Sequence, residues 1–231
     1  MEYSVGHKRR LALRYLFFVI GVAINSFGIA VITKAALGTS PISSVAYVLD
    51  LAFAPTLGEF TFAVNLLFIA LQIVLLRRDF QPIQLLQLVV NVVFSALIDV
   101  SMMLLDGLAP TGPVSQIVLL LAGCTVLALG IAIEVAPNVI VVPGEGAVRA
   151  ISSVSGKPFG SCKVAFDVTL VLIALTLSLV FFHGIQGLGI GTVISALLVG
   201  RIVNLVNRHV PLLAAIAGLS RSEMGAPEAA M

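Results

Sequence analysis

Long apolar runs alternate with short polar connections along the 231-residue chain. The charge-poor runs are 15–33, 60–76, 82–98, 114–133, 164–182 and 185–200. Each run is close to the roughly 20 residues that a helix needs to cross the hydrocarbon core of a bilayer. The pattern therefore predicts six membrane-spanning helices, and it leaves no room for a soluble domain.

A further apolar segment, Leu37–Pro55, is too short to cross. It opens with Gly-Thr-Ser-Pro and holds about thirteen helix-compatible residues before the next proline, against about twenty for a span. We expect a short helix that begins at Pro41, with Ser40 as its cap and with Ser43 and Ser44 in its first turn. Irregular backbone of this kind is tolerated at membrane depth where protein or a water-filled cavity satisfies it. The segment is predicted to enter the membrane and turn back.

The sequence matches itself without gaps at an offset of 102 residues, the separation of Pro41 and Pro143. Glycines and prolines that stay in one register favour a duplicated chain, with repeat 1 over 14–105 and repeat 2 over 114–206. The alternative is that two unrelated halves share an apolar composition. The aligned pairs include Gly21 and Gly123, Gly28 and Gly130, Gly58 and Gly160, and Asn65 and Asp167.

The duplicated position predicts a second short helix that begins at Pro143. The predicted fold class is therefore an all-α polytopic membrane protein with six spanning helices and two short re-entrant or broken helices. The residues expected to act as hinges are Gly38, Pro41, Pro143 and Gly144.

Positive charge predicts how the two halves are oriented, because cytoplasmic loops are enriched in Lys and Arg. If the first short helix does not cross, all the basic segments lie in the cytoplasm and the loop 106–113, which has no Lys or Arg, lies outside. Lys34 alone departs from the rule. Each half then crosses an odd number of times, so the halves are predicted to be inverted repeats in one membrane domain. The basic segments are the N-terminal 1–13, the turn at Arg77 and Arg78, and the tail 207–231.

Three charged residues fall within the apolar second half: Glu145, Lys163 and Asp167. Charges in hydrocarbon cost a few kcal/mol, so they are candidates for function. Lys163 and Asp167 are four residues apart and share one helix face. Either they form a structural ion pair while Glu145 caps a helix, or the three form a site that exchanges a proton or a substrate charge. Glu134 and Arg149 either join this cluster or reach the headgroups.

The first half offers polarity without charge. Asn65 and Gln72 share one face of a predicted helix, and a polar stripe of Gln84, Gln87, Asn91, Ser95 and Asp99 follows the next. Such residues either join helices by hydrogen bonds or line a pathway. The predicted substrate or ion site consists of Glu145, Lys163, Asp167, Asn65, Ser43, Ser44, Gln72, Asn91 and Arg149.

Other chemistry finds little support in the sequence. The segment GLGIGT at 187–192 lacks the preceding strand of a dinucleotide fold, and close packing through small residues explains it better. We see no metal-ligand set, no Ser-His-Asp candidate and no basic-aromatic patch, so we expect no cofactor, no metal, no nucleic acid and no enzymatic activity. Cys124 and Cys162 are expected to pack as small apolar side chains. The apolar stretch Pro211–Leu219 is too short to span and is expected along the interface.

Three parts of the chain resemble the bacterial integral membrane proteins of the YczE/YyaS/YitT type: LGTSPISS, VPGEGAVRAIS with GKPFGSCKVAFDVTLV, and GLGIGTVISALLVG. The resemblance covers roughly 15–205. It implies a bacterial inner-membrane protein, and some relatives are associated with export or with making secreted small molecules. Ser43 stands where the second half has Glu145, so the chemistry of one half does not transfer to the other.

The leading hypothesis is a secondary transporter of a small charged or zwitterionic solute, with a midplane site between inverted repeats. A proton or cation would be the coupling ion, the lipid bilayer the environment, and both termini cytoplasmic. The rival hypothesis is a non-transporting accessory or scaffold protein that supports biosynthesis, export or regulation. Whether the chain forms a homo-oligomer stays open.

Overall fold

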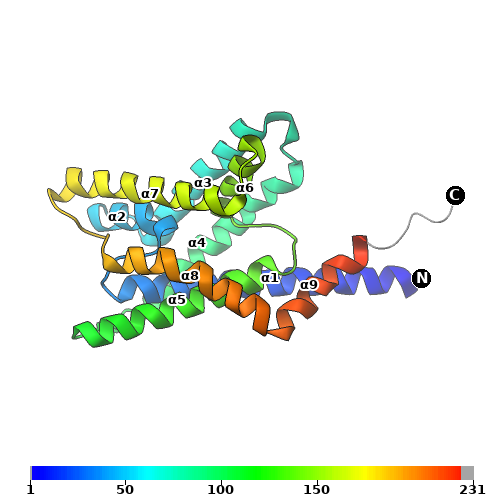
Figure 1. The fold of residues 1–231 in the computed structure, drawn as a ribbon, viewed down its shortest axis with the longest axis horizontal. Coiled ribbons are helices and arrows are strands. Elements are labelled where there is room, and N and C mark those ends of the chain that lie inside the picture. The colour runs from blue at the N-terminus through cyan, green and yellow to red at the C-terminus, as the bar shows by residue number, and fades with distance from the viewer. Residues whose placement is uncertain (1, 225–231) are drawn as a thin grey trace.

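The computed structural model describes residues 2–224, which form helices joined by turns (Figure 1). The predicted all-α polytopic fold class is confirmed, because six described helices are long and apolar enough to span a membrane. The long helices are α1 (Glu2–Lys34), α3 (Leu57–Leu76), α4 (Leu86–Leu104), α5 (Pro113–Val135), α7 (Phe159–Phe182) and α8 (Ile190–His209). The shorter ones are α2 (Ser44–Ala52), α6 (Pro143–Ser155) and α9 (Pro211–Met224), with 3-10 turns at Pro41–Ser43, Arg77–Asp79 and Pro82–Leu85.

The sixth span begins at Ile190, five residues later than its apolar run predicts. The residues before it form a loop that the hydroxyl of Ser178 holds in place. This hydroxyl accepts from the backbone N–H of Gln186 at 2.7 Å and lies 2.9 Å from the carbonyl oxygen of Gly184. A loop fixed in this way supplies backbone partners outside a helix, so hydropathy alone overextends the span.

Ser40 occupies the N-cap position of the first short element, as predicted, but its side chain makes no capping bond to a backbone amide. The first turn is a 3-10 turn in which the N–H of Ser43 bonds the carbonyl of Ser40 at 3.1 Å. Because the backbone already satisfies that amide, the Ser40 hydroxyl is free to donate to the Ser43 hydroxyl at 3.1 Å.

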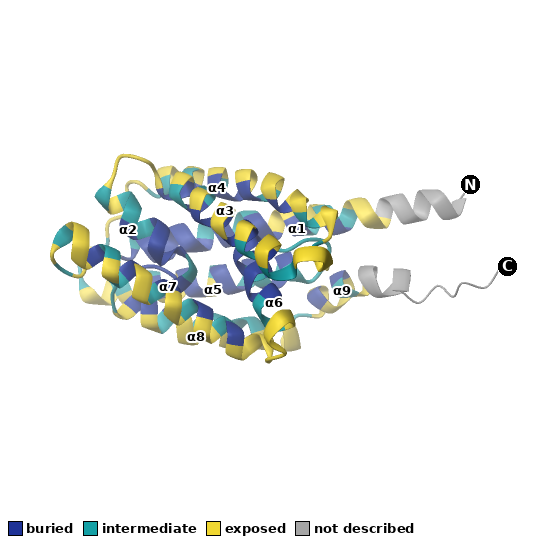
Figure 2. Cartoon of the chain, turned by 90° about the horizontal axis from the view of Figure 1, so that it is seen from above, coloured by how far each residue is buried: buried dark blue, intermediate teal, exposed yellow. Residues whose placement is uncertain are grey.

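Helices α1 and α5 form the centre of the molecule. They run antiparallel in contact along their length, and buried residues gather along them and along α6 (Figure 2). Glycines allow their backbones to approach closely, since a Cβ at any of four positions would overlap the partner helix. The contacts are Gly21 with Glu134, Gly28 with Leu127, Gly130 with Asn25, and Gly123 with Ile32.

These contacts repeat with the 102-residue offset of the sequence. Gly123 lies 102 residues after Gly21, and its partner Ile32 lies 102 residues before Glu134, the partner of Gly21. The contact of Gly21 with Glu134 in one half therefore corresponds to the contact of Gly123 with Ile32 in the other. The same correspondence relates the other two contacts. Other helix pairs correspond in the same way: α2 packs on α7 as α6 packs on α3, and α4 packs on α1 as α8 packs on α5.

One pair of helices breaks this regularity. Helix α3 packs along α4, whereas α7 and α8 are nearly out of contact over their described lengths. Figure 1 shows the separation between α7 and α8. The two halves of the chain therefore share their arrangement but differ at one helix pair.

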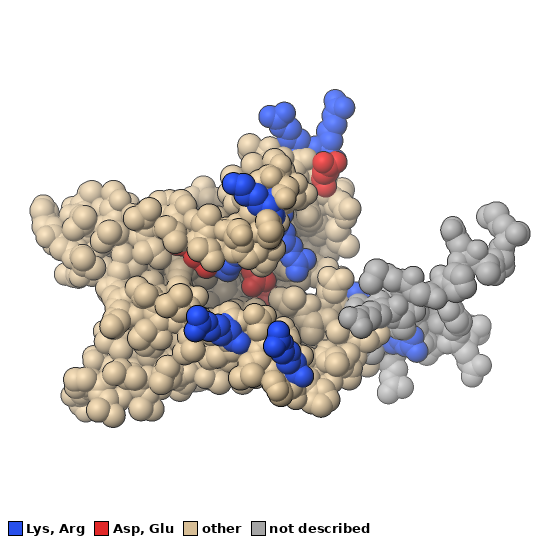
Figure 3. All heavy atoms as spheres, in the orientation of Figure 1, with Lys and Arg blue, Asp and Glu red and all other residues tan. Residues whose placement is uncertain are grey.

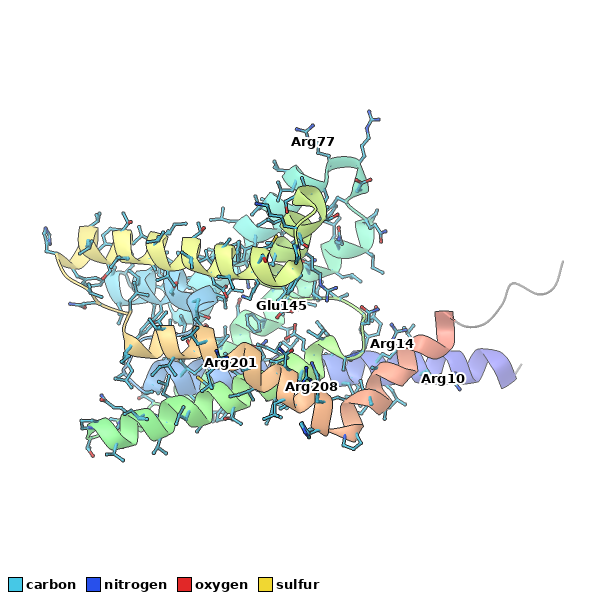
Figure 4. All side chains as sticks on the ribbon, viewed as in Figure 1. Arg10, Arg14, Arg77, Glu145, Arg201 and Arg208 are labelled. Atoms are coloured by element: carbon cyan, nitrogen blue, oxygen red, sulfur yellow. The ribbon has the colours of Figure 1, made fainter. Side chains whose placement is uncertain are left out.

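The molecule has two ends that differ in charge. We call the end that carries the N-terminus the basic end, because the side chains of Arg10, Arg14, Arg77 and Arg208 lie toward it (Figure 4). The opposite end, which we call the acidic end, holds a cavity lined by Lys34 and by three acids: Asp50, Asp99 and Asp106.

The apolar stretch after Pro211 forms α9, which packs against α1 and α8. Leu213 and Ile216 are buried there, while Leu212 is exposed. An amphipathic helix can lie along a membrane interface, and that position of α9 stays a prediction. Residues 225–231 of the predicted tail lie outside the described residues.

The packing of α1 on α5 predicts a steep cost for added bulk. Gly28→Val should destabilise the protein by about 1–3 kcal/mol or more, because its side chain would overlap the backbone of Leu127. Thermal unfolding in detergent micelles measures the effect. Gly200→Val in α8 is the matched control, since nothing lies within 4 Å of its Cβ position. Equal stability of the two variants would contradict the packing argument.

Candidate functional site

A cavity of about 470 Å³ lies at the basic end, lined by residues of the second half of the chain and of α9. We call it the basic-end cavity. Its walls come from the ends of α5 and α8, the starts of α6 and α7, and α9. Figure 3 shows the hollow between α7 and α8, with acidic atoms at its back and basic side chains on its rim. The lining is mostly apolar, with three polar side chains, Glu145, Arg149 and Asn207.

Glu145 lies in the first turn of α6, which Pro143 opens. An acid is favoured at that position, because a helix N-terminus carries partial positive charge. The side chain is half-buried and faces the hollow (Figure 4). Burial raises the pKa of Glu145, while Lys163 and Arg149 act in the opposite direction. Among the described residues, it forms no hydrogen bond and no ion pair within 4 Å.

The predicted pair of Lys163 and Asp167 forms within α7. The ammonium nitrogen of Lys163 lies 2.7 Å from Oδ1 of Asp167, and both side chains are largely buried. Because the two residues belong to one helix, their bond does not tie α7 to another segment. It neutralises two charges near Glu145, whose carboxylate interacts with both.

The sequence left open whether Glu134 joins the charged cluster or reaches the headgroups. It ends the apolar part of α5, and the structure buries it completely in the core. The side-chain N–H of Asn25 on α1 donates to its Oε2 at 2.8 Å. Its carboxylate is fully buried and interacts with the backbone N–H of Val142 at the start of α6, so it joins the cluster rather than the headgroups. The only sequence signal for this was an acid inside an apolar stretch.

Arg149 lies one turn after Glu145 and lines a second cavity on the other side of α6. This cavity measures about 390 Å³ and lies between α6, the loop before it and the start of α4. Its polar lining includes Asp79, Gln84 and Asn138. The exposed guanidinium thus lies where two cavities flank the same short helix.

The first-half amides join helices. Gln72 and Gln87 exchange hydrogen bonds of 3.0 and 3.1 Å, and Gln72 also donates to the carbonyl of Pro143 at 3.2 Å. Asn65 donates to Asn91 at 2.8 Å. These bonds hold α3 against α4 and against the start of α6, and all four amide side chains are buried.

The two short helical elements meet near their N-termini. Gly144 packs against the side chain of Ile42, which a Cβ would overlap. Ser43 and Ser44 are buried beside Ile42, and the Ser44 hydroxyl donates to the carbonyl of Pro41 at 2.6 Å. The predicted hinge segments therefore converge, while the serines are satisfied within their own element.

The GLGIGT segment packs closely, as interpreted from its small residues. The N–H of Gly191 donates to the carbonyl of Leu37 at 2.8 Å, and a Cβ on Gly191 would meet that same carbonyl. Gly38 has a φ of +104°, which few residues other than glycine adopt, and it lies against Thr192. The start of α8 is thereby fixed to the linker after α1.

At the acidic end, Asp99 of α4 binds the N-terminus of α3. It accepts from the Thr56 hydroxyl at 2.7 Å and from the Gly58 N–H at 2.8 Å. Gly58 packs so closely on Asp99 and on the Ser95 carbonyl that a Cβ would overlap both. Burial and the charge of Asp99 raise the pKa of Asp50, which lines the same cavity, to about 6.

Among residues 2–224, no group of three His, Cys, Asp or Glu side chains is positioned to hold a metal ion. No curated protein matches the chain, and neither does any solved structure. The resemblance to the YczE/YyaS/YitT type therefore stays a prediction. Residues 12–208 match the model of a family of unknown function, DUF6198. Since this match covers most of the sequence and reaches into all six apolar helices, the chain belongs to the DUF6198 family.

Proposed function

We propose that the protein is a secondary transporter of a small charged or zwitterionic solute, and that its two ends open alternately. One observation carries the proposal. Gly58 contacts the Ser95 carbonyl and Asp99, whereas Gly160, which lies 102 residues later, has nothing within 4 Å of its Cβ position. Gly58 allows α3 and α4 to pack closely at the acidic end, and Gly160 is the corresponding glycine at the basic end, where it has no such neighbour. Gly160 would contact α8 if α8 moved onto α7.

We infer that the two halves are inverted repeats. The contact of Gly21 with Glu134 corresponds to the contact of Gly123 with Ile32. A twofold axis between the antiparallel helices α1 and α5 produces such matched contacts. Many transporters combine such repeats with interrupted helices that meet near the midplane, and alternate access by moving one part against the other. The meeting of Gly144 and Ile42 supports this arrangement.

Charge accounts for the different state of the two helix pairs. Asp99 places a carboxylate on the N-terminus of α3, where the helix dipole favours it. The residue 102 positions later is Arg201, and Lys157 lies just before α7. A cation on the N-terminus of α7 is disfavoured, so the pair at the basic end rests open.

The basic-end cavity suits a small solute with charged groups. A volume of about 470 Å³ lies within the usual range of ligand pockets. Its apolar wall, with Glu145, Arg149 and Asn207, offers both signs of charge and one amide. A zwitterion can use all three, which favours this class over a purely apolar ligand.

We place both termini in the cytoplasm of a bacterial inner membrane. The basic end then faces the cytoplasm, in accord with the excess of Lys and Arg on cytoplasmic loops. Lys34, which pairs with Asp106 at 3.4 Å, would face the outside. In this orientation the basic-end cavity opens to the cytoplasm.

Spin labels test the alternation without knowledge of the solute. With Cys124 and Cys162, which are buried and free, replaced by Ala, labels at Ser161→Cys and Asn204→Cys report the distance between α7 and α8. We expect two distance populations in lipid vesicles. Gly160→Val should remove the shorter one, because the closed pair would be overpacked by about 1–3 kcal/mol, about 5- to 150-fold in population.

Gly200→Val serves as the control for this experiment, since it also lies in an open position on a long helix. Gly160→Val should unfold at the same temperature as the unaltered chain and yet transport more slowly when a panel of solutes is screened in proteoliposomes. A single distance population in every variant, with no flux of any solute, would instead favour an accessory or scaffold protein.

The acidic end offers a second prediction. Ser95→Cys should be protected from a polar thiol reagent, since Ser95 is buried between α3 and α4. Asp99→Ala removes a carboxylate that accepts two hydrogen bonds, each worth about 1.5–3 kcal/mol. The reaction should then accelerate by about tenfold or more. Asp106→Ala is the control, and equal rates in both variants would show that Asp99 does not hold this end closed.

A further inference from the structure

Two carboxylates at the centre of the molecule have too few partners for both to be charged. Glu134 is fully buried, and only its Oε2 accepts a hydrogen bond, from Asn25 at 2.8 Å. The backbone N–H of Val142 also acts on the carboxylate, but Oε1 receives no hydrogen bond from any described residue. A buried carboxylate oxygen without a donor is costly, so it points to a missing partner.

Glu145 is the nearest candidate for that partner by charge. Val142, whose backbone N–H acts on the Glu134 carboxylate, caps α6, and Glu145 lies in the first turn of that helix, so the two carboxylates lie at the same helix end and repel each other if both are ionised. Glu145 also lines the basic-end cavity, and its side chain makes no hydrogen bond to another described residue. A half-buried carboxyl without a fixed partner is free to turn from the cavity toward Glu134.

The surrounding charges leave one negative charge in excess. Lys163 and Asp167 neutralise each other at 2.7 Å, which leaves Arg149 alone on α6 against Glu134 and Glu145. The other cations that face this region are already engaged or lie on the rim. They are Arg14 of α1, which donates to the carbonyls of Pro137 and Asn138, and the exposed Arg201 and Arg208 of α8.

We propose that Glu134 and Glu145 hold one proton between them. The protonated carboxyl donates to the other carboxylate, which gives Glu134 Oε1 its partner and removes the excess charge. When Glu145 turns to the basic-end cavity, its carboxyl releases the proton to cavity water and becomes a carboxylate. That this proton drives solute movement rests on the proposed function, whereas the shared proton itself does not.

The proton site exists once in the chain. The residues 102 positions before Glu134 and Glu145 are Ile32 and Ser43, neither of which is an acid. A single site placed off the repeat symmetry can exchange its proton differently in the two open states. Coupling needs such a difference, because a group equally accessible from both ends would leak protons.

Infrared difference spectroscopy tests the shared proton directly. Purified protein in lipid vesicles should show the C=O stretch of a carboxylic acid at neutral pH, with a shift in D2O. Glu134→Gln keeps an acceptor for Asn25, and Glu145→Gln breaks no hydrogen bond, so both variants should fold. Each should lose the band. Glu59→Gln, at the exposed cap of α3, is the control and should retain it.

Absence of the band in the unaltered protein, or its persistence in both variants, would overturn the proton site and leave the transport proposal untouched. A band that is present together with solute flux indifferent to a pH gradient would overturn the coupling role. Expected instead is flux that follows the pH gradient and loses this dependence in Glu145→Gln.

Discussion

Helices α1 and α5 pack backbone against backbone at the centre of the molecule, and α4 and α8 pack directly on them. Helices in lipid gain no hydrophobic stabilisation from pairing, so their association relies on van der Waals contact between closely approaching backbones. Glycines at Gly21, Gly28, Gly123 and Gly130 permit that approach. The bond from Asn25 to Glu134 adds a polar contact at the same interface. Helices α4 and α8 pack directly on this pair, α3 packs on α4, and α3 and α7 also pack on the short helices α6 and α2.

A fixed central pair allows the outer helices to differ between the halves, and the side chains account for the difference. Asn65 with Asn91, and Gln72 with Gln87, hold α3 on α4. The positions 102 residues later hold Asp167, which bonds within its own helix, and residues that lack an amide: Ala174, Gly189 and Val193. Where hydrogen bonds across the helices are absent and a cation replaces Asp99, α7 and α8 part. The same backbone plan therefore supports a closed pair and an open pair.

Glu145 lines the cavity beside the parted helices, while Glu134 is fully buried in the core. Charge at membrane depth is costly, and a carboxylate with one unpartnered oxygen adds to that cost. Glu134 would be replaced at a gain in stability if it were only structural, since an apolar residue could fill its place. In the proposed proton exchange, Glu134 shares a proton with Glu145, which lines the basic-end cavity, and this role explains why a costly buried acid is present. The asymmetry of the two halves thus concerns chemistry as well as packing.

The sequence alone determined the features that depend on local spacing. Run lengths predicted six spans, and the four-residue spacing of Lys163 and Asp167 predicted their ion pair, because a helix brings such residues together whatever surrounds it. The offset of Pro41 and Pro143 predicted two short helices. The burial of Glu134 beside Asn25, and the covering of Gly58 but not of Gly160, follow from how the helices pack in three dimensions. Those outcomes depend on distances between helices, which many side chains set together and no local pattern records.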